Sequence, residues 1–140
     1  MIINITYPDK KNDLAISNHI GKSFSWMERV KMGGIGCAKL RIIESSDEIK
    51  HIISANRDTA YCNIEMKKEG LQIGFNSTMR IYAWCIPYYR LNLYYNGGNM
   101  SIYGPKNNVK VQAPFNGTID KKFLKKVLAI KASKSGDSLY

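Results

Sequence analysis

The sequence predicts an α+β protein with an antiparallel curved sheet or partly open β-barrel of six to seven strands, closed by a C-terminal amphipathic helix. Three observations predict this class. Residues 60–113 alternate apolar and polar side chains in short runs between turn residues, as half-buried strands do. Residues 120–130 change to a helical period. Residues 1–58 mix both patterns without a Pro-, Ser- or Gly-rich linker, so we expect one domain over residues 1–140.

Residues 1–58 form a mixed αβ lead-in that we expect to pack on the sheet. Phe24, Met27 and Val30 recur three apart, which indicates a helix. Ser45 and Glu48 have the spacing of a capping box, so a helix should begin there. The other expected elements are strands at residues 2–7 and 38–43 and helical segments at 13–20 and 23–32.

Residues 59–131 hold the strand block and the terminal helix. Alternation at residues 62–66 puts three apolar side chains on one face. Residues 79–86 are apolar on both faces, which predicts the most covered strand, and Pro87 ends it because proline cannot donate to a strand ladder. Residues 96–99 (Asn-Gly-Gly-Asn) are the strongest hairpin signal. The six expected strands lie within residues 62–67, 71–75, 79–86, 89–95, 100–102 and 109–113.

The terminal helix is predicted from its caps and its amphipathic pattern. Thr118 is the expected N-cap, and Asp120 suits the positive end of the helix dipole. Residues 132–140 are expected to form a flexible tail. One side of the helix is apolar (Ile119, Phe123, Leu124, Val127, Leu128 and Ile130) and the other is basic (Lys121, Lys122, Lys125 and Lys126).

Six short strands followed by one amphipathic helix resemble the pleckstrin-homology-like (PH-like) superfold in its small bacterial versions, over roughly residues 60–131. Members typically have seven strands, and residues 39–43 are expected to supply the seventh. The tryptophan common in the family's last helix is absent, with Phe123 as the substitute. The resemblance implies a non-catalytic module that binds lipid headgroups, peptides or domains. It is carried by residues 69–73 (Glu-Gly-Leu-Gln-Ile), residues 80–87 (Arg-Ile-Tyr-Ala-Trp-Cys-Ile-Pro) and the helix at 120–130.

Composition fits an ordinary globular chain. It has 140 residues, of which 44% are hydrophobic and 23% charged. Residues 1–4 lack a signal-peptide pattern and no run could span a bilayer, so we expect a cytoplasmic protein. The three cysteines form no CxxC pair, which favours reduced, buried thiols.

The net charge of +10 is unevenly distributed. Residues 59–140 hold twelve of the 21 Lys and Arg but four of the 11 acids, giving +8. A basic half could meet anionic lipid, nucleic acid or an acidic protein. The alternative is that the helix lysines are only a solvated face.

No motif carries catalytic or metal chemistry, so we expect neither an enzyme nor a cofactor or metal. The glycines at 33–36 lack the spacing of a phosphate-binding loop. His19 and His51 have no second ligand at i+3 or i+4. Nothing supports pairing of Cys37 or Cys85 with His51 as a nucleophile.

Two sets of residues are candidates for binding. Basic side chains at strand ends match where PH-like modules often hold ligands. These ligand-binding candidates are Lys67, Lys68, Arg80, Arg90, Lys106 and Lys110.

The second set is aromatic. If Tyr82, Trp84 and Tyr94 share a sheet face with the two arginines, that face could stack bases and neutralise phosphates. The alternative is that the rings lie beneath the lead-in. The first hypothesis is therefore a non-catalytic module for a protein partner or an anionic membrane surface, and the alternative is a nucleic-acid-binding domain. A homodimer could form through an exposed sheet edge.

Overall fold

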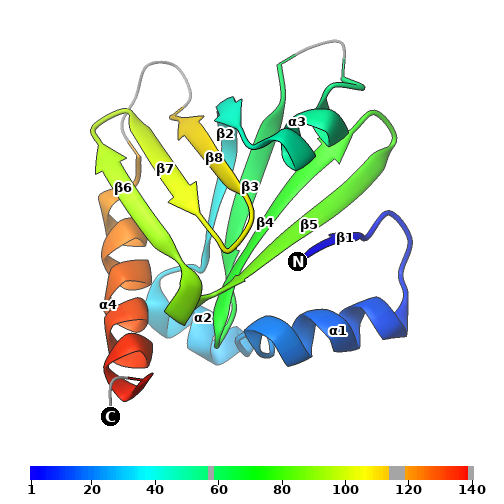
Figure 1. Cartoon of the computed structure of the whole chain (residues 1–140). Helices are drawn as coiled ribbons and strands as arrows, with labels where there is room; N and C mark the ends of the chain where they lie inside the picture. The colour runs from blue at the N-terminus through cyan, green and yellow to red at the C-terminus, as the bar shows by residue number, and fades with distance from the viewer. Residues whose placement is uncertain (57–58, 114–118, 139–140) are drawn as a thin grey trace.

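The structure is a computed structural model that describes residues 1–56, 59–113 and 119–138. Over these residues the chain forms an eight-stranded antiparallel sheet with four α-helices and one 3₁₀ helix (Figure 1). The strands are β1 (Ile2–Asn4), β2 (Gly36–Ser45), β3 (Tyr61–Met66), β4 (Gly70–Ser77), β5 (Arg80–Pro87), β6 (Asn92–Asn96), β7 (Asn99–Tyr103) and β8 (Asn108–Gln112). The helices are α1 (Lys10–Ile20), α2 (Trp26–Met32), α3 (Asp47–Ile53), η1 (Tyr88–Arg90) and α4 (Lys121–Ser138).

The strand order is β1-β5-β4-β3-β2-β8-β7-β6. Two meanders, β2 to β5 and β6 to β8, join where β8 pairs with β2. Because β1 and β6 end the order, the described sheet is not closed into a barrel. The α+β class, the antiparallel pairing and the C-terminal helix are confirmed.

The structure has one strand more than the six to seven predicted. β2 is the expected seventh, longer than residues 38–43 because it pairs with both β3 and β8. β1 is the eighth, and it adds to the free side of β5. The lead-in thus extends the sheet as well as packing on it.

The main core lies between the inner sheet face and α4. Its largest fully buried side chains are those of Trp84, Tyr88 and Phe75. The apolar stripe of α4 joins this core as predicted through Phe123, Leu124 and Val127, together with Ile119 just before the helix. Leu128, which was predicted to share this stripe, is 50% exposed. The expected N-cap at Thr118 lies outside the described residues.

The helix α4 also continues beyond the predicted boundary, since residues 132–138 are helical where a flexible tail was expected. Lys134 Nζ lies 2.9 Å from Glu69 Oε1, an ion pair that ties the extra turns to the β3–β4 turn.

A second, smaller core covers the outer face of β5. Ile16 and Ile20 of α1 pack there against Ala83 and Cys85. The second half of β5 is therefore covered on both faces as predicted, whereas Met79 in the preceding turn is exposed.

The capping box predicted at Ser45 and Glu48 does not form. Ser46 is the N-cap of α3 and makes no side-chain cap. Its Oγ instead donates to Asn107 Oδ1 at 2.7 Å, and Asn107 Nδ2 donates to Glu48 Oε1 at 3.1 Å. Tertiary contacts to the β7–β8 turn have replaced the local cap.

Candidate functional site

The structure does not gather the six basic candidates at one end of the sheet. Lys67 and Lys68 lie in the β3–β4 turn, while Arg80 begins β5 at the opposite end of β4. Successive hairpin turns alternate between the two ends, so these residues are separated by the length of β4. Of the remaining three, Lys106 lies in the β7–β8 turn and Lys110 lies on β8. The guanidinium carbon of Arg90 lies over the Tyr89 ring, 5.6 Å from the ring centroid.

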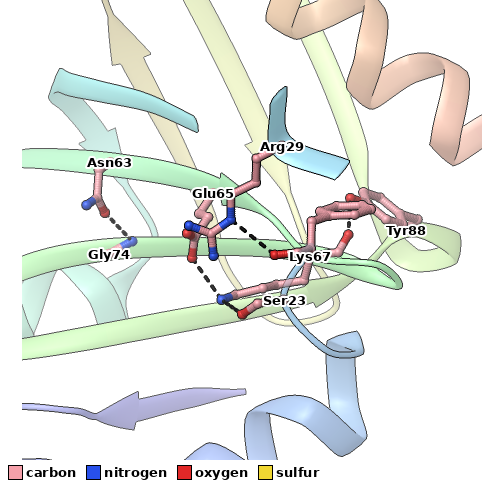
Figure 2. A network of polar contacts seen from close by, with 8 residues as sticks. Ser23, Arg29, Asn63, Glu65, Lys67, Gly74 and Tyr88 are labelled. Carbon is pink, nitrogen blue, oxygen red and sulfur yellow. Dashed lines mark hydrogen bonds and ion pairs between the residues drawn. The ribbon is translucent and has the colours of Figure 1, made fainter. Parts of the chain in front are cut away.

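Lys67 is an internal anchor and is only 9% exposed. Its Nζ lies 2.9 Å from Glu65 Oε2 and donates to Ser23 Oγ at 2.7 Å (Figure 2). Its carbonyl oxygen accepts from the Tyr88 hydroxyl at 2.6 Å. Burial of that hydroxyl raises the pKa of Tyr88, so it remains a donor at neutral pH. Lys67 therefore fixes the segment before α2 to β3 and leaves no ammonium free for a ligand.

Lys68 is also used to hold α2. Its backbone N–H donates to the carbonyl oxygen of Lys22 at 3.1 Å. Its Nζ lies 3.6 Å from Glu28 Oε1, in the first turn of α2. At the other end of α2, Lys126 Nζ donates to the carbonyl oxygens of Gly33 and Gly34 at 3.2 and 3.1 Å. The helix is thus tied down at both ends.

The expected aromatic face is not formed. Trp84 is 1% exposed in the core, and Tyr82 is half-buried against Phe75 with ring centroids 6.0 Å apart. Tyr94 is exposed on β6 and packs edge-on against Tyr103, with centroids 5.5 Å apart. Two of the three rings belong to the inner face and one to the outer face, so the three cannot stack on one ligand.

The sequence sets the start and end of α2 locally. Ser25 Oγ accepts from the Glu28 N–H at 3.3 Å, and Glu28 Oε1 accepts from the Ser25 N–H at 3.0 Å, a complete capping box. The backbone N–H of Ser25 is the main cause of a lowered pKa for the Glu28 carboxyl. Gly33, in the left-handed conformation with φ 72°, ends the helix.

The outward face of α2 is apolar. Trp26, Met27 and Val30 are 77%, 65% and 61% exposed, whereas Met32 packs against the core. With 3.6 residues per turn, the three exposed side chains fall within about 100° of each other, opposite Met32. Phe24, in the preceding loop, also packs against the core. The helix predicted at residues 23–32 is therefore confirmed from Trp26 onward, but Phe24 lies before it and does not share a face with Met27 and Val30.

Cations flank this face on both sides. Arg29 and Lys31 are exposed and fall on opposite edges of the apolar arc. Arg29 Nε donates to the Phe24 carbonyl oxygen at 3.1 Å, which holds its guanidinium close to the helix. In the described part of the chain neither cation takes part in an ion pair. We call Trp26, Met27, Val30, Arg29 and Lys31 the α2 patch.

Several hollows in the described part of the chain are open to solvent and lined by both polar and apolar side chains. One of about 420 Å³ lies between α1 and β4, with Asp13, Ser17 and Gln72 in its lining. Burial raises the pKa of the Cys62 thiol to about 12 and that of Cys85 to about 11, so both are protonated at neutral pH. Residues 1–56, 59–113 and 119–138 contain no group of three or more His, Cys, Asp or Glu that could hold a metal ion.

Comparison with protein-family models finds no match to this chain, and comparison with curated proteins finds none either. No helix in the described ranges is long and apolar enough to cross a membrane. A function must therefore be inferred from the chain's own surface, and the α2 patch is where exposed apolar side chains are held on a fixed helix.

Proposed function

We propose that the chain is a non-catalytic, PH-like binding module that docks on an anionic membrane surface through the α2 patch. The single observation that carries this proposal is the apolar outward face of α2 between two cations. An amphipathic helix with tryptophan on one face and basic residues beside it lies in the plane of a membrane interface. Here the apolar face of Trp26, Met27 and Val30 points away from the protein.

The two kinds of side chain supply two kinds of attraction. Apolar area removed from water is worth about 25 cal/mol per Å². Each Lys or Arg close to an anionic leaflet adds about 1 kcal/mol, which falls off within a Debye length. Arg29 and Lys31 therefore orient the patch, and the net charge of +10 adds long-range attraction.

A membrane suits this patch better than a protein partner does. A stable protein interface takes about 800 Å² from each partner. Three side chains on a two-turn helix cover a few hundred Å² at most, in the range of the ordinary surface patches of monomers. A bilayer interface needs no matching shape, so a small projecting face with flanking cations is sufficient.

The architecture supports the PH-like part of the proposal. Seven strands, β2 to β8, precede a C-terminal helix whose apolar stripe packs on the core. The seventh strand includes residues 39–43, the segment expected to supply it. A binding module of this kind needs no catalytic group.

The test uses Trp26 as its own reporter. Trp84 is buried in the core, so a blue shift of tryptophan emission on adding vesicles reports Trp26. We expect this shift with vesicles of phosphatidylcholine mixed with phosphatidylserine, and a much smaller one with phosphatidylcholine alone. Co-sedimentation is measured in parallel, at low salt and at about 0.15 M salt, where the Debye length is about 8 Å.

Matched variants distinguish binding through the α2 patch from attraction by the net charge or by any exposed apolar side chain. Trp26→Ala and Lys31→Ala should weaken vesicle binding. Met79→Ala removes an equally exposed apolar side chain and Lys106→Ala an exposed lysine away from α2, and both should bind as the parent does. Equal losses in patch and control variants would overturn the proposal. So would salt-resistant binding to single-stranded nucleic acid that is lost in Tyr94→Ala, with no vesicle binding.

A further inference from the structure

The strand β6 has a free edge that nothing in the strand protects. It ends the sheet order, so among the described residues it pairs on one side only, with β7. Natural edge strands are usually guarded by lysine, proline, a bulge or very short length. β6 has five residues, carries no charge and no proline, and pairs with β7 in unbroken register. The other edge, β1, is protected by its length of three residues.

The sequence of β6 is self-complementary. It reads Asn-Leu-Tyr-Tyr-Asn, and four of its five residues are exposed. In a two-fold antiparallel pair centred on Tyr94, Tyr94 faces its own copy, Asn92 faces Asn96, and Leu93 faces Tyr95. Aromatic pairs and aromatic–aliphatic pairs stabilise facing positions in a sheet, and no like charges oppose each other. Tyr94 is already held in place by its edge-on contact with Tyr103.

We propose that β6 is a docking edge for a second copy of this chain, paired antiparallel about Tyr94 to give one continuous sheet. The partner is a second copy because, in this pairing, aromatic, aliphatic and amide side chains face each other favourably and no like charges are opposed. Five residues of strand pairing bury less than the ~1,200 Å² found in the smaller stable complexes, so we expect a weak, reversible dimer with a dissociation constant on the order of 0.1 mM. This inference does not depend on the α2 patch.

Cysteine cross-linking tests both the pairing and its register. Directly opposite residues in an antiparallel pair have Cα atoms about 4.5–5.5 Å apart, within reach of a disulfide. Under a mild oxidant, Tyr94→Cys should therefore give a covalent dimer. Asn92→Cys alone should not, since four residues of offset separate the two copies by about 13 Å. A mixture of Asn92→Cys and Asn96→Cys should cross-link again, and the parent chain serves as the background.

Sedimentation velocity gives the independent reading. The parent chain should associate over about 0.01–1 mM, more strongly at high salt because screening reduces repulsion between two chains of charge +10. Tyr94→Lys should weaken association at least tenfold, whereas Tyr61→Lys, at an exposed tyrosine of β3 that does not contact β6, should dimerise as the parent does. A monomeric parent at the highest concentration and salt, or cross-linking of Asn92→Cys alone in place of Tyr94→Cys, would overturn the proposal.

Discussion

Removing the buried ammonium of Lys67 should lower the stability of the protein and loosen α2. Lys67→Met keeps the apolar stem but removes the contacts of Nζ to Glu65 Oε2 at 2.9 Å and Ser23 Oγ at 2.7 Å. A hydrogen bond to a charged group is worth about 1.5–3 kcal/mol, and a carboxylate left unpaired in the interior costs more. The Glu65 side chain is 37% exposed, so water recovers part of that cost.

The free energy of unfolding should therefore fall by about 2 kcal/mol in Lys67→Met. Urea denaturation measures it, with an unchanged m-value showing that the denatured state is the same. Lys106→Met, an exposed control, should change stability by less than about 0.5 kcal/mol. A double-mutant cycle with Glu65→Gln should show coupling of at least about 1 kcal/mol. If Lys67→Met is no more destabilising than Lys106→Met, Lys67 is not the anchor described above.

Three further outcomes follow from single contacts. Gly70→Ala should destabilise the fold by about 1–3 kcal/mol in urea denaturation, because the added Cβ would clash with the Ile86 carbonyl oxygen and the Ile20 side chain. Trp26→Ala should weaken vesicle affinity roughly 30-fold at unchanged stability, since half-immersing an indole that is 77% exposed is worth about 2 kcal/mol. The Ser25 N–H lowers the pKa of the Glu28 carboxyl. The ionised Glu28 carboxylate therefore stabilises the folded protein above the ordinary pKa of a glutamate, and this stabilisation is lost as the pH falls through the lowered pKa. The difference in Tm between the parent and Glu28→Gln should therefore shrink as the pH is lowered below the ordinary pKa of a glutamate.

Alternation and turn residues were sufficient to predict the strand block, because each strand there is half-buried and each turn has its own Gly or Asn signal. The aromatic face shows where that reasoning fails. Side chains alternate between the two faces of a sheet along a strand, so Tyr82, Trp84 and Tyr94, which are separated by even numbers of residues, would share a face if the strand were unbroken. The 3₁₀ helix η1 separates β5 from β6 and shifts the alternation by one residue. Even-numbered side chains therefore point inward on β5 and outward on β6.

The two capping-box sequences show a different limit. Ser-x-x-Glu occurs at residues 25–28 and again at 45–48, and only the first forms the box. At the second site, Asn107 bonds to both Ser46 and Glu48, from a turn some sixty residues away. No local pattern contains that contact. The outward face of α2 was missed for a related reason, since seven residues make only two turns and a short apolar set cannot show which side faces the core.

The roles of the lysines explain why total charge is a poor guide to the binding surface. Lys67, Lys68, Lys126 and Lys134 all bond to other parts of the chain. Lys67 and Lys68, two of the six predicted ligand contacts, therefore hold elements of the fold together. The remaining net charge draws the protein toward an anionic surface over distances that salt screens. The apolar face of α2 acts only on contact and is insensitive to salt. Binding at about 0.15 M salt should therefore depend more on Trp26 than on any single lysine, and the contribution of each lysine should grow as the salt concentration is lowered.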